Sequence, residues 1–130
     1  MKTLFGLAAV LALGCSGITG AHAAEADGAP LYMNHCAACH GARGEGDGPI
    51  APLLTVTVPN LRELSKRNGG TFPAEAVKAY IDGRNPRPAH GNSAMPVWGD
   101  VFSAATANDE PLVGTRIAVL VAFIEELQYR

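Results

Sequence analysis

Two cysteines and two histidines lie within seven positions, HCAACHG at residues 35–41. Cys36, Cys39 and His40 form the pattern C-x-x-C-H, which is typical of covalent haem attachment. Near the end of a helix, two thiols three residues apart can each reach a vinyl group of one porphyrin, and the next residue can direct its imidazole at the iron. The sequence therefore predicts one haem c, attached through Cys36 and Cys39, with His40 as an axial ligand of the iron.

Other chemistries of paired cysteines explain fewer of these residues. A zinc site usually takes its ligands from two spaced pairs, and the chain has no second cysteine pair. A redox C-x-x-C of the thioredoxin type would be expected beside a βαβ pattern, which the sequence lacks. A structural disulfide suits an exported chain but leaves His40 without a role. Haem attachment is the hypothesis that uses all three side chains.

The second axial ligand must come from a distant part of the sequence, because it has to reach the opposite face of the haem. Met95 meets this requirement, whereas Met1 is in the N-terminal leader and Met33 lies on the attaching helix. His90, in the same loop as Met95, is the alternative and would give bis-histidine ligation with a lower potential. His35 cannot reach the other face and is predicted to be a packing or surface residue.

Further residues are predicted to lie around the haem. The second ring nitrogen of His40 needs a carbonyl acceptor, and Pro49 and Pro52 lie in the loop that must fold back over that face. The sequence does not choose between the two prolines. Trp98 and Tyr80 are candidates for packing on the haem or hydrogen bonding to it and its propionates, with a core position as the alternative.

Helices connected by long loops must position these residues. The first predicted helix runs from Pro30 to about Ala38, and the second covers LRELSKR after an Asn60 cap. The third starts at Thr71-Phe72-Pro73, has an apolar stripe of Val77, Tyr80 and Ile81, and ends at Gly83. The last runs from Pro111 or Thr115 to Gln128. The last is the clearest, because apolar residues repeat with helical spacing at Ile117, Leu120, Val121, Ile124 and Leu127. The loops at 41–52 and 83–99 are rich in glycine and proline, and loops this long usually have a functional reason. No run with period two is long enough for a sheet, so the predicted fold is all-α.

The beginning of the chain has the pattern of an export signal. Lys2 precedes the apolar run LFGLAAVLAL, and Ala21-His22-Ala23 has the small-x-small form of a cleavage site. We therefore expect a signal peptide at 1–23, a mature domain at 24–130 and a periplasmic location. The alternatives are a permanent anchor, for which the run has roughly half of the ~20 residues needed, and lipid attachment at Cys15.

Removing 23 of the 130 residues leaves one small domain with a thin core. Without Lys2 the chain has 9 basic and 12 acidic side chains, and this net charge of −3 argues against nucleic-acid binding. The charge is uneven, because residues 60–90 contain six basic and three acidic side chains. This basic stretch is a candidate docking surface for an acidic partner, or simply a solvated helix face.

The chain resembles the class I monohaem cytochromes c, and more closely their bacterial periplasmic members. The resemblance rests on CAACHG together with MPVWG at 95–99, with GEGDGP as a weaker match, and it covers the mature domain from Tyr32 to the C-terminal helix. It implies a cytochrome c fold, a small helical domain wrapped around one covalently bound haem, in which the first and last helices cross. It also implies His40 and Met95 as the axial ligands.

The resemblance further implies a one-electron carrier rather than an enzyme, since filled axial positions leave no open site on the iron. The expected partners are redox proteins such as a dehydrogenase, a cytochrome complex or a terminal oxidase, with membrane contact only through them and with the chain as a monomer. The alternatives are a haem subunit of a larger oxidoreductase complex, and a haem enzyme or gas-binding protein with an open axial site. The loop around Arg84, Pro86, Arg87, Pro88 and His90 departs from better known soluble carriers and leaves the partner and the potential open.

Overall fold

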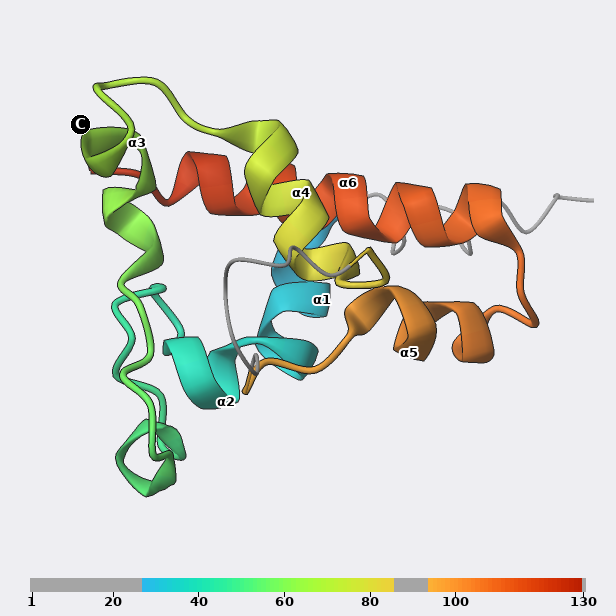
Figure 1. Ribbon diagram of the computed structural model, residues 1–130, viewed down its shortest axis with the longest axis horizontal. Helices are drawn as coiled ribbons and strands as arrows, with labels where there is room; N and C mark the ends of the chain where they lie inside the picture. The colour runs from blue at the N-terminus through green and yellow to red at the C-terminus, as the bar shows by residue number, and fades with distance from the viewer. Residues whose placement is uncertain (1–26, 86–93, 130) are drawn as a thin grey trace, which may run out of the picture.

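The protein is all-α in the part of the chain that its structure, a computed structural model, describes, which is residues 27–85 and 94–129 (Figure 1). The elements in these ranges are α1 Gly28–His35, α2 Ala37–His40, η1 Ala51–Leu53, η2 Leu61–Glu63, α3 Leu64–Arg67, α4 Ala74–Asp82, α5 Trp98–Ala105 and α6 Glu110–Glu126. No strand occurs among them, which confirms the predicted fold class. The predicted signal peptide with Cys15, and His90, lie outside the described residues.

The helix predicted from Pro30 to about Ala38 is two helices. α1 begins earlier, at Gly28, because the Asp27 side chain accepts a hydrogen bond from the Ala29 amide at 2.9 Å and caps it. The chain bends at Cys36, and α2 then continues to His40. This break separates the first thiol from the second thiol and the imidazole, so the C-x-x-C-H residues lie on a bend between two helices.

α6 is the central packing element, and α1, α4 and α5 all pack against it. It begins at Glu110, where Asp109 accepts a hydrogen bond from the Leu112 amide at 3.1 Å. Its buried residues are Val113, Ile117, Leu120, Val121 and Ile124, which confirms the predicted apolar face. No helix of the described residues is long and apolar enough to span a membrane.

α1 crosses α6 closely, as the resemblance implies (Figure 1). Gly28 permits this approach, since a Cβ there would overlap the Val119 carbonyl and the Phe123 side chain. Near the same crossing the fully buried Tyr32 ring lies 5.1 Å from the Phe123 ring, centroid to centroid. The position of the haem-attaching helix is therefore set by the C-terminal helix.

The two predicted helices between residues 60 and 83 are present. Asn60 accepts a hydrogen bond from the Arg62 amide at 2.9 Å and begins η2, which leads into α3. α4 ends at Gly83, whose φ of 67° is left-handed and favours glycine. Val77 and Ile81 are buried, but Tyr80 is 52% exposed. Of the three residues of the predicted apolar stripe, Tyr80 is therefore not part of the core.

α5 is the helix that the sequence interpretation missed. It begins at Trp98, inside a segment predicted as loop from its glycines and prolines, and Phe102 on it is 1% exposed. Trp98 and Phe102 are four residues apart and mark one helix face, which was the available signal. α5 packs against α4 and α6 and leads directly from the MPV residues into the core.

Candidate functional site

Cys36, Cys39, His40 and Met95 line one cavity of about 420 Å³. Its other described lining side chains are mostly apolar or aromatic, and Trp98 and Tyr80 are among them. The fold thus brings the C-x-x-C-H residues together with the methionine that the sequence singled out far along the chain. The site has three ligand types that suit an iron porphyrin: thiols for covalent attachment, an imidazole and a thioether.

The Cys36 thiol lies at the bend between α1 and α2, and the Cys39 thiol lies within α2. Cys36 is 8% exposed and Cys39 is partly exposed, and neither is in a disulfide. Burial raises the pKa of the Cys36 thiol to about 12, and Cys39 adds to the effect. Cys36 is therefore a protonated thiol at neutral pH, and both sulfurs are available for thioether formation.

His40 presents a neutral imidazole to the cavity. Burial lowers its pKa, and the backbone carbonyl of Pro59 acts in the opposite direction. Its Nδ1 is buried and has no hydrogen-bond partner of standard geometry among the described residues, although Pro59 lies beside it in the cavity wall. A neutral imidazole is the form that binds a metal, and a carbonyl beside the second nitrogen would fix its orientation.

The structure does not place Pro49 or Pro52 where the sequence analysis expected them. Both are exposed and absent from the cavity lining, whereas Pro59 is part of it. The loop does return to the cavity between the two candidate prolines, at Ile50, but the carbonyl beside the His40 imidazole belongs to Pro59, later in the sequence. No local signal marked Pro59, because a proline ring fixes φ and not the direction of the carbonyl that follows.

The loop after His40 is held by backbone hydrogen bonds to α2. The amides of Gly46, Gly48 and Ile50 donate to the carbonyls of His40, Cys39 and Ala38 at 2.8, 3.1 and 3.1 Å.

The hydroxyl of Tyr32 adds a buried hydrogen bond of 2.8 Å to the Gly41 carbonyl. Burial, with smaller contributions from Cys36 and Asp47, raises the pKa of Tyr32 well above its ordinary value, so the phenol remains a donor. Tyr32 is therefore a structural support for the end of α2, a role that the sequence interpretation did not assign.

Another part of the cavity wall contains Met95 and the start of α5. Met95 is partly buried. Trp98 lies 5.2 Å from the His35 ring and is stacked on Phe102 at 5.7 Å, centroid to centroid. His35 is therefore a packing residue, one of the two roles predicted for it. The position of His90 is outside the described residues, and the structure does not test its ligation.

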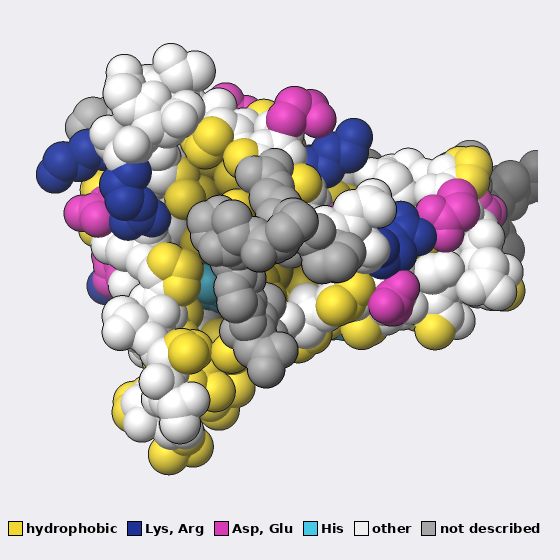
Figure 2. Space-filling model, in the orientation of Figure 1, with side chains coloured by type: hydrophobic (Ala, Val, Ile, Leu, Met, Phe, Trp, Pro, Cys, Tyr) yellow, Lys and Arg dark blue, Asp and Glu magenta, His cyan; other side chains and the backbone are white. Residues whose placement is uncertain are grey.

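Three arginines of the basic stretch are paired with acidic side chains. Arg62 lies 3.0 Å from Glu45, and Arg67 lies 3.2 Å from Glu63. Arg84 contacts both Asp82 and Glu110. Figure 2 shows basic and acidic side chains beside one another on this face instead of a patch of one sign. These arginines form local ion pairs, which weakens the argument for an open cationic docking surface.

Comparison with known proteins agrees with this site. A sequence profile of the family described as cytochrome c matches residues 25–128 of the chain. Cytochrome c6 of Bryopsis maxima is 33% identical to it over 73 residues, which cover 56% of this chain and 68% of that protein. No solved structure matches the chain at comparable significance.

Proposed function

We propose that this chain, which belongs to the cytochrome c family and therefore carries covalently bound haem c with its iron, transfers single electrons in the periplasm with His40 and Met95 as axial ligands. The family and the cytochrome c6 relative support a haem-carrying electron carrier and not an enzyme. The finer proposal depends on one observation, that a neutral imidazole and a thioether from distant parts of the chain line the same apolar cavity.

When bound, haem c supplies an iron that changes between the ferric and ferrous states by one electron. Cys36 and Cys39 would hold the porphyrin through thioether bonds, so that it stays with the protein after export. His40 would bind the iron in its neutral form, with Pro59 orienting the ring. Met95 would occupy the remaining axial position, which leaves no site on the iron for a substrate.

The apolar wall has its own part in this function. Ile50, Leu54 and Val56 line the cavity together with Val58 and Pro59 and make this part of its wall apolar. An apolar lining disfavours added charge, so the surroundings of the site and the identity of its ligands would together set the reduction potential. With His40 and Met95 both bound to the iron, little rearrangement would accompany the gain or loss of an electron.

The location and partners form part of the same proposal. The export pattern at residues 1–23 supports a mature periplasmic domain at 24–130, and lipid attachment at Cys15 is the alternative. A soluble monomer would exchange electrons with redox proteins such as a dehydrogenase, a cytochrome complex or a terminal oxidase. The mass of the purified mature chain distinguishes cleavage after Ala23 from acylation at Cys15.

The optical spectrum of the ferric, haem-loaded protein tests the ligation. Methionine sulfur on low-spin iron gives a weak far-red band, which we expect in the native chain and in His90→Ala, but not in Met95→Ala. A native spectrum without the band would overturn His/Met ligation. Loss of the band in His90→Ala with retention in Met95→Ala would also contradict it.

A further inference from the structure

The two segments on either side of residues 86–93 meet at the end of α4. Gly83 lies against Val97, because a Cβ on Gly83 would be 3.4 Å from the Val97 Cα. Gly99 lies still closer to the preceding segment, since a Cβ there would overlap the Asp82 carboxylate and the Arg84 guanidinium. Residues 82–84, at the end of α4, are therefore packed against residues 97–99, which follow Met95.

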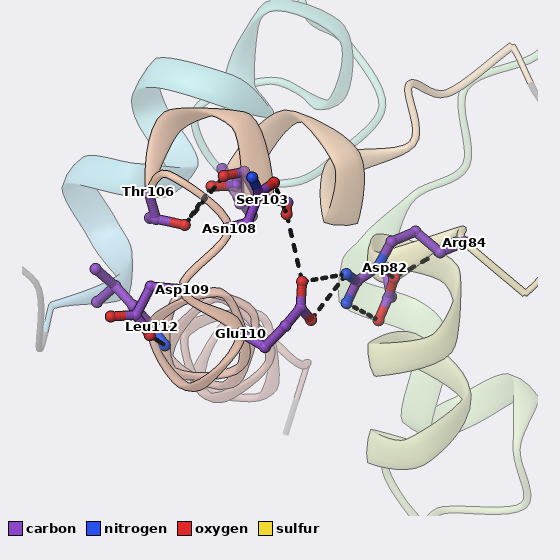
Figure 3. A network of polar contacts seen from close by, with 9 residues as sticks. Asp82, Arg84, Ser103, Thr106, Asn108, Asp109, Glu110 and Leu112 are labelled. Atoms are coloured by element: carbon purple, nitrogen blue, oxygen red, sulfur yellow. Dashed lines mark hydrogen bonds and ion pairs between the residues drawn. The ribbon is translucent and has the colours of Figure 1, made fainter.

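Arg84 connects this meeting point to the rest of the fold (Figure 3). Its Nε and Nη2 donate to the two carboxylate oxygens of Asp82 at 2.6 and 3.1 Å. Its Nη1 donates to both carboxylate oxygens of Glu110 at 2.9 Å. The Ser103 hydroxyl lies 3.3 Å from Glu110 Oε1. One guanidinium thus connects the end of α4 with the first residue of α6, and Glu110 extends the network to α5.

The Asp82–Arg84 pair of this network is better placed than a solvated ion pair, whereas the Glu110 side chain is 56% exposed. The Arg84 and Asp82 side chains are only 30% and 29% exposed, and the pair is bidentate. The guanidinium holds the pKa of Asp82 below its ordinary value, so the carboxylate stays charged at neutral pH. Planar donors in a fixed fork can hold two carboxylates in one orientation, which a flexible lysine cannot do as well.

Met95 depends on the segment that this network holds. It lies four residues before Gly99, which is packed against Asp82 and Arg84. Between them, Trp98 is held by its contacts with His35 and Phe102. The start of α5 is thereby held on two sides, by the His35 ring from α1 and by the Asp82–Arg84 pair.

We propose that Arg84 is a positioning residue for Met95: through Asp82 and Glu110 it holds the start of α5 against the end of α4 and keeps the thioether in the haem cavity. This inference rests on the proposed ligation by Met95. Arg84 itself does not line the cavity. Its role is to make dissociation of Met95 from the iron less frequent, because the intact network holds residues 97–99 against the end of α4.

The rate at which cyanide replaces Met95 in the ferric, haem-loaded full chain tests this role. Arg84→Gln removes the guanidinium, and Arg67→Gln is the matched control, because it removes the same charge from an ion pair with Glu63. After cyanide addition, we expect the far-red band to disappear about tenfold faster in Arg84→Gln than in the native chain. This factor corresponds to the free energy lost with hydrogen bonds between charged groups. The control should change by less than about twofold, as for an exposed ion pair.

A second pair of variants protects the test against misfolding of Arg84→Gln. Glu110→Gln leaves the Asp82–Arg84 pair in place and weakens the contacts of Glu110 with Arg84 and Ser103, and Glu63→Gln is its control. Glu110→Gln should speed cyanide binding more than Glu63→Gln does. If Arg84 had a purely structural role, its loss would lower the thermal midpoint of unfolding, but the cyanide-binding rates of Arg84→Gln and Glu110→Gln would equal those of their control variants. That result would overturn the inference.

The outcomes also separate the inference from the function on which it rests. A native spectrum without the far-red band would overturn both the His/Met ligation and the positioning role. A native band that disappears in Met95→Ala, combined with equal cyanide rates in the Arg84 and Arg67 variants, would overturn the positioning role alone.

Discussion

The two walls of the haem cavity are built in different ways. The attachment wall contains Cys36, Cys39, His40 and the loop that returns to Pro59, whereas the methionine wall contains Met95 and the start of α5. The first is held mainly by backbone hydrogen bonds between residues close in sequence. The second is held by side chains that come from four different helices.

This difference has consequences for His40 and Met95, the two residues proposed as axial ligands. On the attachment wall, the His40 amide donates to the Cys36 carbonyl at 2.9 Å, and the following loop pairs with α2. Such contacts join backbone atoms close in sequence, so few of them depend on a side chain from a distant helix. On the methionine wall, replacing one side chain such as Arg84 removes several contacts at once. We therefore expect covalent attachment to be robust and the methionine bond to be the adjustable part of the site.

The largest expected effect is the loss of covalent haem attachment when both thiols of the attachment wall are removed. Replacing Cys36→Ser together with Cys39→Ser should abolish covalent haem, because a serine hydroxyl does not form the thioether bond. Haem staining after denaturing electrophoresis measures this directly. Met95→Ala is the matched control and should retain the stain in full, since the methionine wall has no part in attachment. Stain in the double serine variant, or its loss in Met95→Ala, would contradict this division of roles.

A smaller effect is expected from the backbone packing of the attachment wall. Gly48→Ala would push a Cβ into the backbone of Ala38 and Cys39, so the loop must move away from α2. Overpacking of this kind should lower the free energy of unfolding by about 1–3 kcal/mol, measured by urea denaturation.

Gly114→Ala provides the control for Gly48→Ala. Gly114 is exposed within α6, and a Cβ there meets nothing within 4 Å. The alanine should raise the free energy of unfolding by about 0.5–1 kcal/mol, because glycine is a poor helix former. Equal effects of the two substitutions would show that the close backbone approach at Gly48 does not matter.

The smallest effect concerns the pH dependence of the methionine wall. The Arg84 guanidinium lowers the pKa of Asp82 from its ordinary 3.8, so on acidification the unfolded chain takes up this proton before the folded one does. The contribution of the pair is therefore complete above pH 3.8 and is lost as the pH falls through the lower folded value. Asp82→Asn should cost less than about 1 kcal/mol at neutral pH.

The measurement for Asp82 is the free energy of unfolding of both proteins between neutral and acidic pH. The difference between the native chain and Asp82→Asn should shrink as the pH falls below the ordinary pKa of an aspartate. A difference that stays constant over this range would mean that the Arg84 contact with Asp82 is not electrostatic in origin.

Much of the fold was predictable because its signals are local. The caps at Asn60 and Gly83 and the apolar face of α6 depend on residues a few positions apart, and all three are present. α5 was missed because the glycines and prolines before it indicated a loop, while its two aromatic residues indicated a helix only in combination. Pro59 was missed because no local pattern reports where a loop returns to an imidazole.

The sequence by itself determined the chemistry of the attachment wall, because two thiols and an imidazole at fixed spacing define haem binding before any folding is considered. It also singled out Met95 among three methionines. Only the tertiary structure decided that Met95 shares a cavity with His40, that Pro59 lies beside the imidazole, and that Arg84 joins Asp82 to Glu110. Apart from the local Asp82–Arg84 pair, these contacts join residues distant in the chain, and their partners are chosen by the packing of α1, α4 and α5 on α6.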